Sequence, residues 1–355
     1  MSDKKKKSKK EATVLPAHVE QMRTRVTVGE HAVVHGKGFD AADAFRSLGF
    51  DNSLRLDKFR ENLQIKIIEK KEDKVVFDVV GVDAAIANAL RRILLAEIPT
   101  MAIEVARIFQ NTSIIQDEVL AHRLGLVPIF ADPRMFQTVE ETKDGVHNEH
   151  NTIVFTLDVA CSRNTKALPS APVEEQFINA VVYSKDLVWV PQGDQLARFG
   201  NNPPRPVHDD IIIAKLRPGQ SIEVECRAQK GIGQTHAKWS PVCTASYRLM
   251  PDVVLNQTVT GDQAAALVDC CPMKVFDIED MGNEKKAVVS YPRNCTMCRE
   301  CVRLPEVKDL VTLQRVRDHY IFSIESTGIY KPTELFREAI KVLMNKCDTV
   351  LQHLS

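Results

Sequence analysis

The chain has 355 residues and a mass of 39.8 kDa, a length that suggests about two to three domains. Its 47 Lys and Arg residues balance its 47 Asp and Glu residues, so bulk charge gives it no general attraction for nucleic acid. No apolar run approaches the roughly 20 residues of a membrane-spanning helix, and the first ten residues lack the apolar stretch of a secretory leader, so we expect neither.

Lysines crowd the first eleven residues, with six of them between positions 4 and 10. Like charges at this density repel one another and cannot pack, so the segment is predicted to be a solvated tail. It could serve as a nuclear-import signal or a polyanion-binding arm, or it could only solubilise the chain. Residues 12–50 show no sustained period and are predicted to form an extended arm.

A hairpin and a helix follow the arm. Apolar and polar residues alternate over 63–67 and again over 75–79, a pattern that predicts two antiparallel strands. Asp83 is a suitable helix N-cap, and apolar residues then recur at helical spacing until Pro99. We therefore predict an amphipathic helix over residues 84–98.

The centre of the chain is predicted to be rich in strands. Alternation and short apolar runs predict strands at 102–109, 153–159, near 181 and 188, and at 211–214, 222–226, 242–250 and 320–324. A short helix is predicted over 116–124, closed by Gly125. Amphipathic helices at both ends of a strand-rich centre indicate an α+β fold with mainly antiparallel pairing.

The last helix has an unusually wide apolar stripe. Pro332 suits its first turn. The apolar positions span about five turns and are Leu335, Phe336, Ala339, Ile340, Leu343, Met344, Cys347, Val350 and Leu351. Such a stripe could lie against the chain's own sheet on one side and a partner on the other, or it could be buried within its own domain.

Two adjacent arginines lie on the first helix. Arg91 and Arg92 project about 100° apart, so at least one leaves the apolar face. The planar guanidinium suits protein interfaces, although the pattern alone favours ordinary solvated helix charge. His122-Arg123 on the short helix is likewise more typical of a surface contact than of catalysis.

Cysteines give the strongest local chemical signal. Without an export signal, the nine cysteines are predicted to be reduced thiols or metal ligands. Cys295, Cys298 and Cys301 follow one another at two-residue gaps, and Cys271 precedes a proline, as the fourth ligand of a ferredoxin-type cluster does. These four thiols could hold one iron–sulfur cluster or one zinc ion, or they could be thiols of a fold that has lost its cluster.

Other candidate motifs lack residues that their proposed function requires. Gly231-Ile232-Gly233 lacks the third glycine of a dinucleotide-binding loop, because His236 occupies that position. No phosphate-binding P-loop occurs, and His208-Asp209-Asp210 is more typical of a solvated turn than of a metal site. The residues alone therefore indicate a scaffold with one cysteine-bearing insertion rather than an enzyme.

Three blocks carry a family resemblance. They are VGVDAAIANALRRILLAEIPTMAIEVARIFQNTSIIQDEVLAHRLGLVPIF (80–130), KGIGQTHAKWSPVCTASYR (230–248) and DHYIFSIESTGIYKPTELFREAIKVL (318–343). In this order they resemble the α-like subunits of cellular RNA polymerases, the family of bacterial α and archaeal D, over roughly residues 54–355. Within the family the chain is most similar to the larger α-like subunit shared by polymerases I and III.

The resemblance implies a dimerisation domain that is split in the sequence. Its parts would be 54–99, 242–259 and 307–355, with an insert domain at 100–241, a ferredoxin-like insertion at 260–306, and the basic tail and arm at 1–53. A similar segment in archaeal D subunits carries a cluster, which supports an iron–sulfur cluster at Cys271, Cys295, Cys298 and Cys301, although many eukaryotic relatives lack these cysteines.

The resemblance also implies a non-catalytic assembly function in the nucleus, including the nucleolus, in transcription of rRNA, tRNA and 5S rRNA. The expected partners are the smaller α-like subunit, which forms a heterodimer through helices 84–98 and 333–352, the second-largest subunit and small zinc-binding subunits. DNA would be contacted only through the complex. The implied contact residues are Ile86, Leu90, Arg91, Arg92, Ile93, Leu94, His122, Arg123, Leu335, Ile340, Leu343 and Cys347. The alternative function is iron–sulfur electron transfer or redox sensing.

Overall fold

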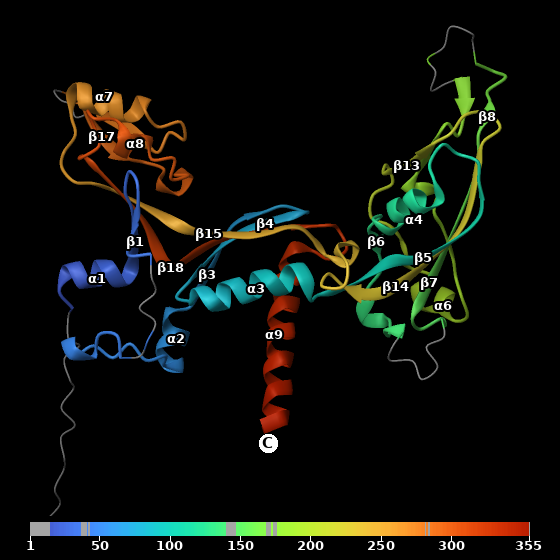
Figure 1. Ribbon diagram of the computed structural model, residues 1–355, viewed down its shortest axis with the longest axis horizontal. Helices are drawn as coiled ribbons and strands as arrows, with labels where there is room; N and C mark the ends of the chain where they lie inside the picture. Colours follow the sequence, from blue (N-terminus) through green and yellow to red (C-terminus); the bar gives the residue numbers. More distant parts are fainter. Residues whose placement is uncertain are drawn as a thin grey trace, which may run out of the picture. The chain divides into compact units, whose positions relative to one another are not determined.

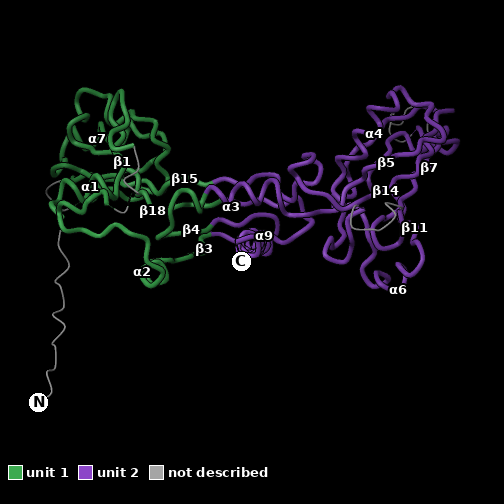
Figure 2. Tube along the Cα trace, turned by 60° about the horizontal axis from the view of Figure 1, so that its bottom comes forward, with its two compact units in different colours: residues 1–68, 77–87, 247–322 green, residues 69–76, 88–246, 323–355 purple. Residues whose placement is uncertain are grey.

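The computed structural model describes residues 15–36, 41, 43–139, 147–167, 172, 176–280, 282 and 285–354. The chain divides into two compact units, shown in different colours in Figure 2. Unit 1 comprises residues 1–68, 77–87 and 247–322, and unit 2 comprises 69–76, 88–246 and 323–355. This division follows contacts in space and does not test the predicted sequence boundaries. The lysine-rich tail lies outside the described residues.

A six-stranded sheet joins segments from both ends of the sequence (Figure 1). Its order is β2-β1-β18-β4-β3, with β15 also pairing with β18. The strands are β1 (Arg25–Val28), β2 (Val33–Val34), β3 (Gln64–Lys70), β4 (Lys74–Val80), β15 (Val242–Leu255) and β18 (Val311–Ser326). In unit 1 the rings of Phe77 and Phe322 stack with centroids 5.5 Å apart, and Tyr247 meets Tyr320 edge-on.

The predicted β3–β4 hairpin is confirmed, but its two strands differ in burial. On β4, Val75, Phe77 and Val79 are buried, as the alternation requires. Every residue of β3, the last strand of the sheet, is exposed, including Ile65 and Ile67. The alternation therefore identified the strand correctly, although the chain's own fold does not cover it.

The predicted first and last helices are also confirmed. Helix α3 (Ala84–Ala96) follows Asp83, whose carboxylate accepts a hydrogen bond from the Ala85 N–H at 2.7 Å, as an N-cap should. Helix α9 (Pro332–Leu354) begins at Pro332, as predicted from its fixed φ. Among the described residues, no helix is long and apolar enough to cross a membrane.

Unit 2 contains most of the strand-rich centre. Its four-stranded antiparallel sheet has the order β11-β7-β14-β5, from β11 (Val188–Val190), β7 (Thr152–Ala160), β14 (Ser221–Ile232) and β5 (Pro99–Asn111). Helix α4 (Asp117–Gly125) packs on this sheet through Leu120 and Leu124, which are fully buried. The shorter elements are β6 (Ile129–Phe130), η2 (Pro133–Met135), β8 (Ser162–Arg163), β9 (Phe177–Ile178), β10 (Val181–Tyr183), η4 (Ser184–Asp186), α6 (Gln195–Phe199), β12 (Arg205–Pro206), β13 (Ile212–Lys215) and η5 (Ala237–Trp239).

Unit 1 contains the cysteine-bearing segment and the N-terminal region. The segment comprises α7 (Gly261–Asp269), β16 (Phe276–Asp280), β17 (Lys285–Val289), η6 (Pro292–Asn294) and α8 (Glu300–Arg303) around a small apolar core. The region predicted as an extended arm contains α1 (Ala17–Thr24), η1 (Arg46–Leu48) and the β1–β2 hairpin, and α2 (Leu56–Asn62) follows it. These elements are too short to produce a visible sequence period. Together, the helices and strands of the chain form the predicted α+β fold.

Candidate partner-binding surface and cysteine pocket

The distal part of α9 presents an apolar stripe that none of the described residues covers. Ile340, Met344, Cys347, Leu351 and Leu354 follow one another at alternating steps of four and three, the spacing of a helix–helix seam. The exposed fractions of Met344, Leu351 and Leu354 are 59%, 63% and 79%. In Figure 1 the C-terminal half of α9 lies clear of the other ribbons. An apolar stripe of this length indicates a docking surface.

The first turns of α9 are instead part of the chain's own core. Leu335 and Ala339 are fully buried. Further along, the Lys346 ammonium forms an ion pair with Glu97, at 2.7 and 2.8 Å from the two carboxylate oxygens. Of the predicted contact residues on α9, Ile340 and Cys347 are exposed, Leu343 is half-buried, and Leu335 is sealed inside the fold and cannot reach a partner.

Helix α3 offers less partner-facing surface than predicted. Leu90, Ile93 and Leu94 are buried within this chain, because their side chains form the helix's inward face. Ile86 is half-buried. Arg91 donates a hydrogen bond to Asn88 at 3.0 Å, and Arg92 is exposed. The structure therefore leaves Ile86, Arg91 and Arg92 as the accessible members of the predicted set on this helix.

Helix α4 uses one of its two predicted contact residues internally. The Arg123 guanidinium donates to the carbonyl oxygens of Ile213, at 2.8 Å, and Ile212. It thereby ties α4 to β13, while Arg123 itself stays exposed at the surface. His122 is exposed and keeps its predicted surface position.

The predicted cysteine quartet lies around one pocket, together with a fifth thiol. Cys271, Cys295, Cys298 and Cys301 all line it, and so does Cys270. The pocket holds about 330 Å³ of empty space, part of it open to solvent. The sequence analysis missed Cys270 because the cluster pattern requires only one thiol before the proline, although its adjacency to Cys271 was visible.

Two residues between the pocket thiols have an unusual backbone conformation. Met297 and Arg299 adopt left-handed conformations, with φ of 61° and 70°, although neither is glycine. Non-glycine residues hold this conformation only where the surroundings require it. The Val275 N–H donates to the Cys271 sulfur at 3.4 Å.

Burial favours the protonated form of three of the pocket thiols, Cys270, Cys295 and Cys301, by raising their pKa values. It raises the pKa of Cys270 to about 11 and that of Cys301 to about 12, and neighbouring pocket thiols add to both shifts. Burial also raises the pKa of Cys295, although a hydrogen bond from the Met297 backbone partly opposes it. Metal binding would therefore release protons from this site.

The four predicted thiols offer a donor set that both predicted metals take. Zinc binds four thiolates at a Zn–S distance of about 2.3 Å. In an iron–sulfur cluster each thiolate binds a different iron. The shared pocket is therefore compatible with either metal.

A buried ion pair attaches the cysteine segment to the large sheet. Asp78 on β4 is 6% exposed and accepts two hydrogen bonds from Arg293, at 2.7 and 2.9 Å. His319 Nε2 lies 3.1 Å from the same carboxylate but outside hydrogen-bonding geometry. Arg293 lies in the turn that ends at Cys295, so the pair fixes the position of this thiol relative to β4.

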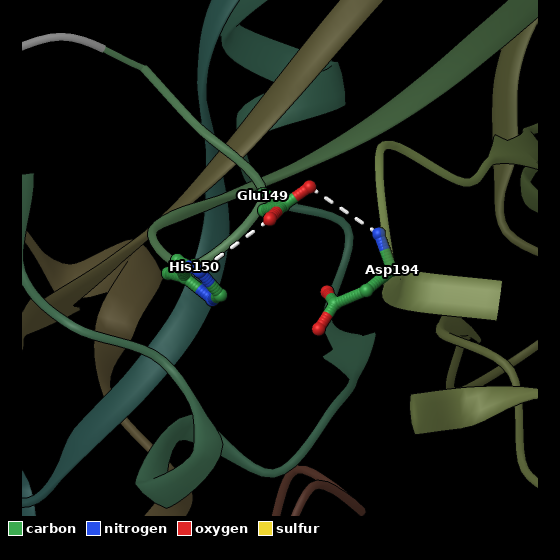
Figure 3. Close-up of side chains that lie close together, drawn as sticks. All are labelled: Glu149, His150 and Asp194. Atoms are coloured by element: carbon green, nitrogen blue, oxygen red, sulfur yellow. Dashed lines mark hydrogen bonds and ion pairs between the residues drawn. The ribbon is translucent and has the colours of Figure 1, made fainter. Parts of the chain in front are cut away.

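Figure 3 shows a second group of metal-type side chains, in unit 2. Donor atoms of Glu149, His150 and Asp194 lie within 4.8 Å of one another. The group already has a cation, because Arg198 Nη1 lies 3.2 Å from His150 Nδ1 and 3.5 Å from Asp194 Oδ1. Asp194 also donates its backbone N–H to Glu149. These contacts explain the cluster without a metal ion.

Comparison with known proteins identifies the family. The model of the RNA polymerase Rpb3/Rpb11 dimerisation domain matches residues 76–347. The chain is 48% identical over 340 residues to "DNA-directed RNA polymerases I and III subunit rpac1" of Dictyostelium discoideum, covering 95% of each chain. It is 47% identical over 339 residues to the Homo sapiens subunit RPAC1, covering 95% of this chain and 96% of the relative. The corresponding Saccharomyces cerevisiae subunit is 42% identical over 301 residues, covering 84% of this chain and 89% of the relative. The chain therefore belongs to the RNA polymerase Rpb3/Rpb11 dimerisation-domain family.

Proposed function

We propose that this chain is a non-catalytic assembly subunit of nuclear RNA polymerases I and III. The names of its relatives support this assignment, with coverage of nearly the whole chain. The observation that carries it is the exposed stripe on α9, which lies partly within the matched dimerisation domain. In this function the chain acts in the nucleus, including the nucleolus, in the transcription of rRNA, tRNA and 5S rRNA.

The proposed direct partner is the smaller α-like subunit, bound through α9 and the accessible residues of α3. The heterodimer would then bind the second-largest subunit and small zinc-binding subunits. Arg92 and His122 are exposed and available for those contacts. Phosphodiester chemistry would belong to the largest subunits, and DNA would be reached only through the assembled complex.

Affinity purification of the tagged full chain from nuclear extract tests this function. The smaller α-like subunit and the large subunits of both polymerases should copurify at near-stoichiometric amounts. A Met344→Glu/Leu351→Glu variant should lose them, because it places charge in the apolar stripe. The matched control is Glu223→Gln, a change on the insert sheet away from α9. Recovery of wild-type chain without any polymerase subunit would contradict the proposal.

We also propose that Cys271, Cys295, Cys298 and Cys301 hold one iron–sulfur cluster with a structural role. The shared pocket and the two-residue gaps between Cys295, Cys298 and Cys301 support it. Four cysteine thiolates are the donor set that such clusters take. The names of the relatives give no support to electron transfer, so the cluster would stabilise the cysteine-bearing segment of a polymerase subunit.

Anaerobic purification of the full chain tests this site through iron content, acid-labile sulfide and visible absorbance. Wild type should contain iron and sulfide. Cys298→Ser should lose most of both, because three thiolates hold a cluster poorly. Cys270→Ser is the matched control, since it removes the neighbouring thiol outside the predicted quartet. Iron-free and sulfide-free wild type under these conditions would refute the cluster.

A further inference from the structure

The turn η2 is firmly attached to the core of unit 2. Phe136 directly follows it, is 3% exposed and stacks on Phe199 with centroids 5.2 Å apart. The Phe136 carbonyl oxygen accepts a hydrogen bond from Lys230 at 2.9 Å, and that of Met135 accepts one from Arg198 at 2.7 Å. Side chains on this turn are therefore held at a fixed place on the insert.

Arg134 reaches from this turn to α9. Asp132 orients its guanidinium through hydrogen bonds of 2.8 Å from Nε and 2.7 Å from Nη2. The third nitrogen, Nη1, lies 3.5 Å from a carboxylate oxygen of Glu338 in the second turn of α9. The guanidinium also lies over the Tyr330 ring, 5.8 Å from its centroid. One side chain thus contacts the helix and the loop that leads into it.

The loop that leads into α9 is also held by contacts within unit 2. Thr327 donates from its backbone N–H and its hydroxyl to the Pro241 carbonyl oxygen, both at 3.0 Å. Gly328 has φ of 92°, and a Cβ there would lie 2.3 Å from Val207, so only glycine permits this approach. The Tyr330 hydroxyl donates to the Pro99 carbonyl oxygen at 3.3 Å.

Beyond Ala339, α9 has no buried residue. The segment from Ile340 to Leu354 is about 22 Å long at 1.5 Å per residue. A tilt of about 10° at its base would displace the far end by about 4 Å, nearly half of the roughly 8–10 Å that separates the axes of two packed helices. The direction of the first two turns, together with the Lys346–Glu97 ion pair further along, therefore decides where the exposed stripe lies.

We propose that Arg134 is a positioning residue for partner binding, which sets the direction of α9 from the insert without touching the partner. The proposal rests on the function proposed above and names the part of the chain that orients its docking helix. The insert would accordingly contribute to dimerisation, although the apolar seam lies on α9.

Binding kinetics with the immobilised smaller α-like subunit test this role. If α9 points in the binding direction for only a fraction of the time, only that fraction of the molecules can bind. The association rate and the apparent affinity then fall in proportion to this fraction. Arg134→Gln should slow association about two- to fivefold, the size expected from a half-exposed ion pair, and leave dissociation nearly unchanged. Glu338→Gln should slow association at least as much, because it loses both Arg134 and Lys341, which lies 2.8 Å from the same carboxylate oxygen. Adding Arg134→Gln to Glu338→Gln should change little, because the Arg134–Glu338 contact is already lost. Leu351→Ala should instead speed dissociation, since it removes a direct contact.

Arg205→Gln is the matched control. Arg205 also lies over an aromatic ring of the insert, that of Phe130 at 4.6 Å, and its hydrogen bonds go to Asn202 and Pro203. It should bind like wild type. Unchanged association of Arg134→Gln, or a change confined to dissociation, would overturn the positioning role. Failure of the wild-type chain to bind would refute the proposed partner instead.

Hydrogen exchange measured on the isolated full chain, with no partner present, tests the positioning role of Arg134. Arg134→Gln should speed amide exchange in residues 332–346 and leave β14 protected as in wild type. Unchanged exchange in α9 would overturn the proposal. Faster exchange throughout unit 2, with β14 included, would also overturn it, because Arg134 would then hold the fold together rather than direct one helix.

Discussion

Asp78 is a buried carboxylate, and its neighbours determine how much its charge contributes to the stability of the fold. Burial alone would raise the pKa of the carboxyl, but the hydrogen bonds from Arg293, together with the electrostatic effect of the nearby His319 ring, outweigh burial and hold the pKa below its ordinary value. A depressed carboxyl pKa stabilises the fold at pH values above the unfolded pKa of about 3.9. This contribution is lost as the pH falls through the folded pKa.

We expect Asp78→Asn to reduce the free energy of unfolding by about 1–3 kcal/mol at pH 7, because Arg293 loses its buried acceptor. Urea denaturation at pH 7 and pH 3 checks this, and the difference from wild type should shrink at pH 3. Asp252→Asn is a suitable control, since its pair with Arg25 is about one-third exposed on both sides and should matter by less than about 1 kcal/mol. Equal losses at both pH values would contradict the electrostatic explanation.

The glycines of the rejected dinucleotide motif have a packing explanation. A Cβ at Gly231 would lie 2.4 Å from the Trp239 ring, and one at Gly233 would lie 2.3 Å from the Leu95 carbonyl oxygen. We expect Gly231→Ala to lower the free energy of unfolding by about 1–3 kcal/mol through overpacking, measured by thermal denaturation. Gly219→Ala has open space around its Cβ and should cost only its backbone strain. A neutral Gly231→Ala would show that Trp239 can move aside.

Helical periodicity in α9 predicted which side of the helix is apolar, but it could not predict where along the helix the chain's own core ends. Leu335 and Leu351 belong to the same stripe, yet Leu335 is fully buried and Leu351 is 63% exposed. The difference arises from distant segments that cover only the first turns. In α3, likewise, the pattern could not separate Leu90, which faces the chain's own core, from a partner-facing residue.

This contrast gives a prediction with matched variants. Leu335→Ala should lower the free energy of unfolding by about 2–5 kcal/mol, because it opens a cavity. Leu351→Ala should change it by no more than about 0.5 kcal/mol, because the side chain is exposed in the free chain. Denaturation of the free chain measures both. Equal losses would mean that the distal stripe is covered in solution, for instance by self-association.

Strands were predicted well where apolar and polar residues alternate strongly, as in β7. Where the alternation is interrupted, the predicted strands were too short. β14 was expected over 222–226 but runs from Ser221 to Ile232, because pairing with β5 continues past two register shifts. The cysteine pocket was found because ligand spacing is local in sequence. Arg134 and Asp78 were missed, since their partners Glu338 and Arg293 lie far along the chain.

At the scale of the whole molecule, the large sheet depends on both ends of the sequence. β1 pairs with β18 from Arg25 opposite Val316 to Val28 opposite Leu313. Removing residues 1–36 should therefore leave part of an edge of β18 unpaired, which promotes strand-to-strand aggregation. We expect a lower thermal midpoint and faster aggregation than for removal of residues 1–11, measured by light scattering on heating. Identical behaviour of the two truncations would show that the hairpin contributes nothing.

The distant pairing in this sheet also has a consequence for synthesis on the ribosome. β4 emerges early, but its neighbour β18 is translated only after the insert and the cysteine-bearing segment. The insert strands pair with one another and can fold while the remainder is still being made. The large sheet and α9, which follows β18, are therefore completed last. A nascent or prematurely terminated chain lacks the partner-binding surface and cannot bind another polymerase subunit through it.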